Sequence, residues 1–182
     1  METQPEPTLI EFVRYTQWAN QQLLTVCMSL SEDRLKTGRP GAYGSILETF
    51  AHILRAEASF LKRIHGTCPE PAFQWEENPT LAQMAIYEAE LGQALMDTLQ
   101  RVPPTQNVHE EGNGMLFDYQ ARLIFMSLVY HGIAHRTDIT TVLNGQGVEL
   151  LELDVWGYQF AHPERFQAKL RKAGANSEMI DD

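Results

Sequence analysis

The sequence predicts an all-α domain: a four-helix bundle with long connections and a short C-terminal helix packed on one end. Four segments repeat apolar residues at the three- and four-residue spacing of an amphipathic helix. Strand-like alternation is almost absent, and no internal repeat occurs. The 182 residues fit a single domain. Helices that bury their apolar faces against one another form this architecture most simply.

The predicted starts of the first three helices are marked by capping residues. Thr8 precedes the first apolar stripe, and Ser45 precedes the second, with Glu48 completing a capping box. The second helix is expected to end at Gly66, since glycine adopts the left-handed conformation that closes many helices. Thr80 is the expected cap of the third helix.

The connections and the fourth helix follow from breaks in periodicity. Residues 66–79 contain three prolines and no helical period, which predicts a long crossover loop. Prolines at 103–104 end the third helix. A turn at 112–114 has flanks that form either a short hairpin or a simple loop. The fourth helix, expected over 118–143, is apolar almost all round between 121 and 134. Such a helix is either central in the core or shared with a second subunit.

The end of the chain predicts one more short helix. Asp154 is its expected cap, and aromatic residues follow it at 156, 158 and 160. The bundle is therefore expected over 8–161. Residues 1–7 and 162–182 are expected to be peripheral or flexible.

Composition narrows the partners and the compartment. The net charge of −10 argues against nucleic acid or an anionic membrane as a partner. We expect no membrane span, because no stretch of 18 apolar residues occurs. The two cysteines form no CxxC pair, and no signal peptide is recognised. A cytoplasmic location is the expectation.

The fourth helix carries a histidine pair. His131 and His135 are four residues apart, so they share one helix face, and Asp138 lies on the same face. Imidazoles at this spacing can occupy two positions on one metal ion. The alternative is that they are hydrogen-bonded core histidines. The pattern is not that of zincin proteases, which require glutamate where this chain has Gly132.

Other polar residues interrupt the predicted helices. His52 lies beside the apolar stripe of the second helix. It is either an exposed histidine without a function or one that faces a groove with room for a ligand. Glu57 falls inside that stripe, and a hydrogen bond to a neighbour is favoured over a role in chemistry. Asn20, in a helix interior, indicates a specific hydrogen bond. Glu88 and Glu90 are interpreted as the solvated face of the third helix.

Three segments together resemble the DinB/YfiT family of metalloenzymes. They are YTQWANQQLL at 15–24, FAHILRAE at 50–57 and HGIAHR at 131–136. The LNGQG segment and the region of Asp154 and Tyr158 resemble the end of that family, so the resemblance extends over about 8–161. It implies a four-helix bundle.

The resemblance implies that His52, His131 and His135 bind one divalent metal ion, zinc or nickel first, with iron or manganese as alternatives. It further implies a homodimer through bundle helices, a small-molecule substrate and a low-molecular-weight thiol such as bacillithiol, mycothiol or glutathione. The chain departs from the family at Thr137 and Asp138. Asp138 is expected either to support a ligand histidine or to act as a fourth ligand.

The favoured function is thiol-dependent S-transfer at the metal. The alternatives are a hydrolase that uses metal-bound water, and a non-catalytic dimeric bundle that binds metal or a small ligand. The candidates for proton transfer are Glu48, Glu57 and Asp138, with no preference among the three. Arg136 is interpreted as a structural ion-pair partner that faces away from the ligands.

Overall fold

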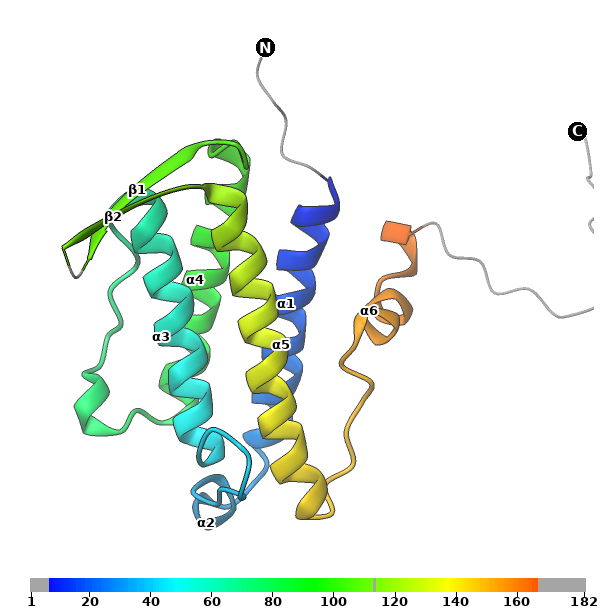
Figure 1. Ribbon diagram of the computed structural model, residues 1–182. Helices are drawn as coiled ribbons and strands as arrows, with labels where there is room; N and C mark the ends of the chain where they lie inside the picture. Colours follow the sequence, from blue (N-terminus) through cyan, green and yellow to red (C-terminus); the bar gives the residue numbers. More distant parts are fainter. Residues whose placement is uncertain (1–6, 113, 167–182) are drawn as a thin grey trace, which may run out of the picture. The chain divides into compact units, whose positions relative to one another are not determined.

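The structure, a computed structural model, describes residues 7–112 and 114–166. Within these residues the chain is mostly helical and contains one antiparallel two-stranded sheet (Figure 1). The prediction of a mostly helical domain is confirmed. The sheet is the short hairpin that the sequence left open as an alternative to a loop.

Four long helices pack around one core: α1 (Pro7–Cys27), α3 (Ile46–His65), α4 (Leu81–Arg101) and α5 (Ala121–Gly145). Each packs against two others, with α3 and α1 both lying against α4 and α5. Helices α3 and α4 run in the same direction, and α1 and α5 run opposite to them (Figure 1). The chain must therefore cross the length of α3 before α4 begins, which explains the long connection.

The capping signals act as predicted in α3 and α4. The Ser45 side chain accepts from the backbone N–H of Glu48, whose carboxylate accepts from the Ser45 N–H at 2.8 Å. Gly66 closes α3 with φ 76°, and Thr80 forms a capping box at the start of α4. Thr8 differs from its prediction, because α1 begins one residue earlier, at Pro7.

A hairpin connects α4 to α5. Strand β1 (Asn107–Gly112) pairs with β2 (Met115–Gln120), and Gly114 supplies the positive φ of the turn, 73°. Of the two predicted alternatives, the hairpin is the one found. The prediction that the fourth helix starts near Asp118 is wrong, because Asp118 pairs with His109 inside the sheet.

The core is filled by large apolar side chains from all four long helices. Phe50 on α3, Phe125 on α5, Leu95 on α4 and Leu23 on α1 are each no more than 1% exposed. The α1–α3 connection contains the single turn α2 (Glu32–Leu35), and the α3–α4 connection contains a 3₁₀ turn, η1 (Trp75–Glu77). Burial of these apolar faces is the main force that holds the helices in place.

The described residues divide into two compact units, one ending at Leu150 and the other beginning at Leu151. In the second, α6 (Val155–Ala161) is followed by a 3₁₀ turn, η2 (Pro163–Phe166). Asp154 caps α6 as predicted, accepting two backbone N–H groups at 2.9 Å. Most of the predicted peripheral ends, 1–7 and 162–182, lies outside the described residues. Among the described residues, no helix is both long and apolar enough to cross a membrane.

Candidate metal centre

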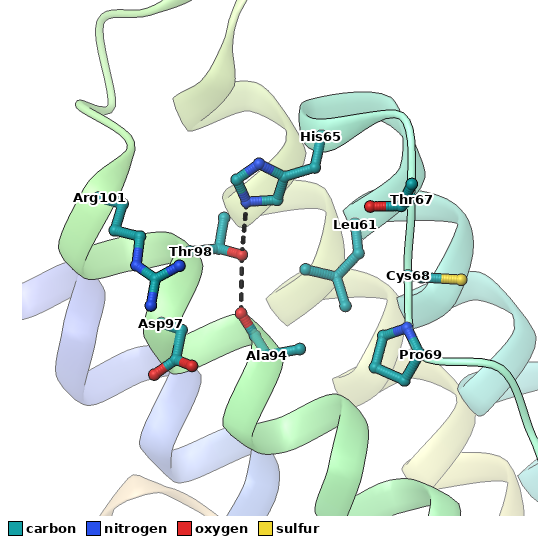
Figure 2. A pocket seen from close by; sticks show the side chains of 9 residues that line it. All are labelled: Leu61, His65, Thr67, Cys68, Pro69, Ala94, Asp97, Thr98 and Arg101. Carbon is teal, nitrogen blue, oxygen red and sulfur yellow. Dashed lines mark hydrogen bonds between the residues drawn. The ribbon is translucent and has the colours of Figure 1, made fainter.

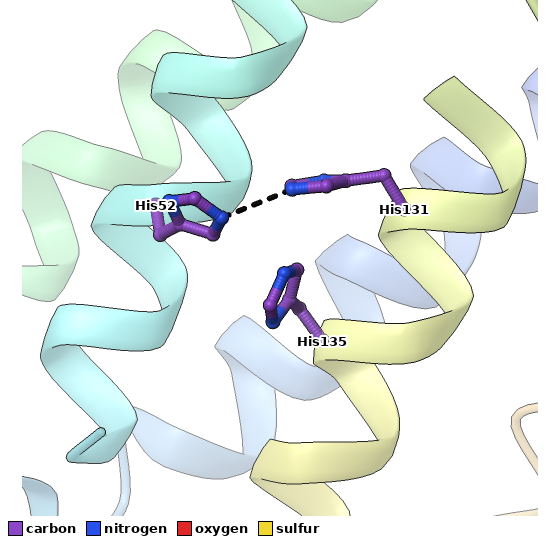
Figure 3. A group of neighbouring side chains, drawn as sticks. All are labelled: His52, His131 and His135. Atoms are coloured by element: carbon purple, nitrogen blue, oxygen red, sulfur yellow. Dashed lines mark hydrogen bonds between the residues drawn. The ribbon is translucent and has the colours of Figure 1, made fainter. Parts of the chain in front are cut away.

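Three histidines from two helices converge on the side of the molecule where α3 faces α5. His52 projects from α3, and His131 and His135 project from successive turns of α5 (Figure 3). One ring nitrogen from each lies within 4.8 Å of the others. All three side chains are half-buried. We call these residues the histidine cluster.

The donor atoms are arranged as metal ligands would be. The Nε2 atoms of His52 and His131 are 3.0 Å apart, and the ring centroids are separated by 4.4 to 4.8 Å. Two nitrogens that bind one zinc ion at about 2.0–2.1 Å each are themselves roughly 3 Å apart. The donor set therefore fits one divalent ion of the kind that imidazole prefers.

The environment favours the neutral form of the His52 and His131 imidazoles. Burial, followed by the charges of His135 and His52, lowers the pKa of His131 to about 4. Burial, followed by His135 and Arg55, also lowers the pKa of His52. Only a neutral imidazole has a lone pair free for a metal. Both residues are therefore in the ligating form at neutral pH.

Asp138 supports the third histidine. Its carboxylate lies 3.0 Å from Nδ1 of His135, one helical turn away on α5. Because a carboxylate only accepts, Nδ1 carries the proton and Nε2 is left as the donor atom for a metal. Among the described residues, the group that could hold a metal contains the three histidines and not Asp138.

Aromatic rings border the histidine cluster. Tyr43, in the loop before α3, stacks on His52 with ring centroids 4.1 Å apart and planes inclined by 19°, and its edge approaches His135 at 5.1 Å. Phe60 contacts His131 at 6.1 Å. The sequence did not indicate Tyr43, because it lies in a glycine-rich loop without a period. The signal that the sequence did offer for Tyr43 was an aromatic residue shortly before the start of α3, the helix that carries His52.

A second polar cluster lies in the core behind the histidines. Arg136, adjacent to His135 in sequence, is 3% exposed and points into the core. Its Nη1 donates to the Asn20 carbonyl at 2.9 Å, and the Asn20 amide donates to Glu57 at 3.0 Å. Glu88 on α4 is 2% exposed and lies close enough to influence Glu57. We call Asn20, Glu57, Glu88 and Arg136 the inner cluster.

The inner cluster settles three sequence interpretations. Arg136 faces away from the histidines, but it donates to the Asn20 amide oxygen and forms no ion pair among the described residues, so the ion-pair part of its interpretation is not confirmed. Glu57 and Asn20 form the specific hydrogen bond that was predicted. The interpretation of Glu88 as solvated is wrong. It lies beside Tyr87 on the buried face of α4, where Gln21 donates to it at 3.4 Å. Burial raises the pKa of Glu57 to about 7, and burial together with Glu57 raises that of Glu88 to about 8.

Gly132 gives the Arg136 side chain its path into the core. A Cβ atom at position 132 would lie 2.7 Å from Nη1 of Arg136 and 3.4 Å from Cγ2 of Thr16. The first distance is too short for any side chain. Gly132 stands where the zincin pattern requires glutamate. Its lack of a side chain leaves space for Arg136, so it has a packing role.

The candidates for proton transfer are dispersed. Glu48 is exposed, and its carboxylate is engaged by the Ser45 backbone, which lowers its pKa. Glu57 belongs to the inner cluster. Of the three candidates, Asp138 is the one hydrogen-bonded to a member of the histidine cluster.

A further histidine belongs to a separate pocket. His65, at the end of α3, lies in a pocket of about 390 Å³ that borders α4 (Figure 2). Thr98 donates its hydroxyl proton to the Ala94 carbonyl at 2.7 Å, so it accepts from Nε2 of His65 at 2.9 Å. Cys68 lines the same pocket, but its sulfur points away from His65 (Figure 2). This histidine is held by the Thr98 side chain of α4 and takes no part in the metal group.

Comparison with known proteins agrees with the geometry of the site. A search of curated proteins found no match. The profile of the DinB family matches residues 1–180, nearly the whole chain. The chain belongs to the DinB family.

Proposed function

We propose that this chain is a four-helix bundle of the DinB type that binds one divalent metal ion through His52, His131 and His135 and catalyses thiol-dependent group transfer. The observation that carries the proposal is the convergence of three donor nitrogens within 4.8 Å. Zinc and nickel suit an all-imidazole donor set best, with iron and manganese as alternatives.

The number of ligands favours catalysis over a structural role. Structural zinc sites have four protein ligands, whereas catalytic sites leave a position for water or substrate. The histidine cluster provides three, and the neighbouring Tyr43 is 51% exposed. A small molecule can therefore approach the cluster from solvent.

Thiol transfer accounts best for the residues around the site. When bound, a divalent ion would act as a Lewis acid that favours the thiolate form of a low-molecular-weight thiol. The histidines bind and Asp138 orients His135, while no further carboxylate within the described residues belongs to the group. A hydrolase is the second candidate, and the carboxylate nearest the histidines that could act as its general base, Asp138, is already engaged in orienting His135.

A second copy of the chain is the proposed partner. Helix α5 exposes an apolar row at three- and four-residue spacing: Leu123, Met126, Tyr130 and Ile133, which are 40 to 76% exposed. Contiguous apolar surface of this kind commonly marks an interface. We propose a homodimer through this row. Sedimentation equilibrium should give twice the chain mass for the native protein and the single mass for Tyr130→Glu.

Metal analysis tests the site directly. Protein purified without a histidine tag should contain about one equivalent of divalent metal by mass spectrometry. The His131→Ala/His135→Ala variant should contain almost none. His109→Ala is the matched control, because His109 is an exposed histidine paired with Asp118 on the hairpin. Metal loss in the control, or retention in the double variant, would refute this ligand set.

Transfer assays then test the activity. Bacillithiol, mycothiol and glutathione are each offered with an electrophilic acceptor such as chlorodinitrobenzene, and product formation should require metal and the three histidines. Turnover of esters or amides without thiol would favour the hydrolase. Metal binding without turnover of either substrate class would favour a non-catalytic bundle.

A further inference from the structure

A second binding site is formed by the outer face of α3 and the crossover connection. A pocket of about 440 Å³ lies between them, and Tyr87 of α4 contributes to its wall. Arg55, Ser59 and Lys62 line it from α3. Their spacing of four and three residues places a guanidinium, a hydroxyl and an ammonium group in one row along the helix.

The opposite wall is aromatic and is fixed in place. Phe73 and Trp75 meet edge to face at 4.8 Å, and both rings contact Tyr87 at 5.9 Å. The Tyr87 hydroxyl donates to the Pro69 carbonyl at 2.9 Å, which ties the connection to α4. The pocket is therefore formed before any ligand binds, and it offers a flat apolar surface.

Within the described part of the chain, the two cations of this pocket form no ion pair. The Arg55 guanidinium lies 5.4 Å from the centre of the Trp75 ring. Over residues 7–112 and 114–166, no carboxylate lies within ion-pair distance of Arg55 or Lys62. Glu70 lines the pocket from the connection, where it lies near Tyr87. The lining thus has two cations against the one carboxylate of Glu70, and in a chain of net charge −10 this local excess of positive charge favours an anionic ligand.

We propose that this pocket binds a small molecule with a flat aromatic body and one anionic group, with the body against Trp75 and the anion between Arg55 and Lys62. The volume lies within the range of small-ligand sites, about 300–1,000 Å³. Carboxylate and phosphate share the required chemistry, because both accept from guanidinium and ammonium groups. The site goes beyond the proposed function and does not depend on metal.

The pocket is separate from the histidine cluster although both use α3. Arg55 follows His52 by three residues and is close enough to lower its pKa, but its guanidinium lies over the Trp75 ring, on the side of the crossover connection. The lining of the pocket includes none of His52, His131 and His135. Binding at one site can therefore be measured without the other.

Magnetic resonance at Trp75 tests the proposal. Benzoate and phenyl phosphate are titrated into the full chain, and the Trp75 indole N–H is followed after assignment with Trp75→Phe. We expect one or both probes to shift this signal, and the stronger probe identifies the preferred anion. Inorganic phosphate should bind at least about tenfold more weakly than phenyl phosphate, and benzyl alcohol more weakly than benzoate.

Three variants separate this site from others. Arg55→Gln/Lys62→Gln should weaken probe binding about tenfold or more, because the charge-assisted hydrogen bonds are lost. Arg101→Gln removes one positive charge from the pocket that contains His65, and it should leave binding of the probes unchanged. The His131→Ala/His135→Ala variant should bind the probes normally. No shift with either probe, wild-type affinity in Arg55→Gln/Lys62→Gln, or lost binding in the histidine variant would overturn the proposal.

Discussion

Helices α3 and α5 carry the whole histidine cluster and also contribute Glu57 and Arg136 to the inner cluster. The two clusters differ in burial and in charge. The histidines are half-buried and lie beside an exposed tyrosine. The inner cluster is closed in the core and combines two carboxyls with one guanidinium. His135 and Arg136 are adjacent in sequence and yet belong to different clusters. One residue of helical rotation, about 100°, is enough to separate a candidate reactive site from a structural one.

The difference predicts which cluster holds the fold together. Removing one partner from a buried charged network leaves the other groups without compensation, whereas half-exposed histidines can be solvated. Changes in the inner cluster should therefore affect the free energy of unfolding. Changes in the histidine cluster should affect metal affinity.

Arg136→Met is expected to have the largest effect. The substitution leaves Glu57 and Glu88 buried without a cation and removes the donor to Asn20. We expect the free energy of unfolding to fall by about 3–5 kcal/mol, measured by urea denaturation. Arg101→Met, at an exposed position, should change it by less than about 0.5 kcal/mol. Equal losses in the two variants would contradict a structural role for the inner cluster.

The two clusters should also respond to pH in opposite directions. The folded pKa values of Glu57 and Glu88, about 7 and about 8, lie above the unfolded value near 4.3. Their stabilisation is fully present below about pH 4.3 and is lost as pH rises through 7 to 8. The folded pKa of His131 is about 4, below the unfolded value near 6.5. Its stabilisation is present above about pH 6.5 and is lost as pH falls toward 4.

Urea denaturation of the metal-free protein between pH 4 and 8.5 measures both slopes. Glu57→Gln/Glu88→Gln should remove a decline of several kcal/mol between pH 5 and 8, because each carboxyl contributes about 1.4 kcal/mol per pH unit wherever only the folded state holds its proton. His131→Ala should flatten the curve below pH 6.5 and leave that decline unchanged. A pH profile of the glutamine variant that matches the wild type would show that the two carboxyls are already ionised in the folded chain.

Asp138→Asn is expected to act on the metal alone. The amide retains an acceptor for His135 Nδ1 but loses the charge that makes the imidazole a stronger ligand. Competition with a chromophoric chelator should show metal affinity reduced about 10- to 100-fold, with the free energy of unfolding of the metal-free protein nearly unchanged. Asp97→Asn, on α4, is the control. Unchanged affinity in Asp138→Asn would remove Asp138 from the site.

The same comparison explains what the sequence could predict. Helical spacing placed His131 and His135 on one face, and capping residues located the starts of α3 and α4. Spacing left His52 undecided, because its position depends on how α3 packs against α5. The resemblance to the DinB family implied that His52 is a metal ligand. Glu88 was misplaced because a charge next to an apolar stripe is usually solvated, and its burial depends on contacts with α1.

Tyr43→Ala should have the smallest effect. It tests which groups exclude water from the His52 imidazole. Tyr43 is half-exposed, so its loss should cost less than about 1 kcal/mol of unfolding free energy. Burial is the main reason that the pKa of His52 is lowered, and the stacked ring covers one face of the imidazole. We therefore expect this pKa to rise toward its usual value in the metal-free variant, as measured by proton magnetic resonance of the His52 ring. Tyr130→Ala, on the exposed row of α5, should leave it unchanged. An unaltered pKa in Tyr43→Ala would mean that α3 and α5 alone exclude water from His52.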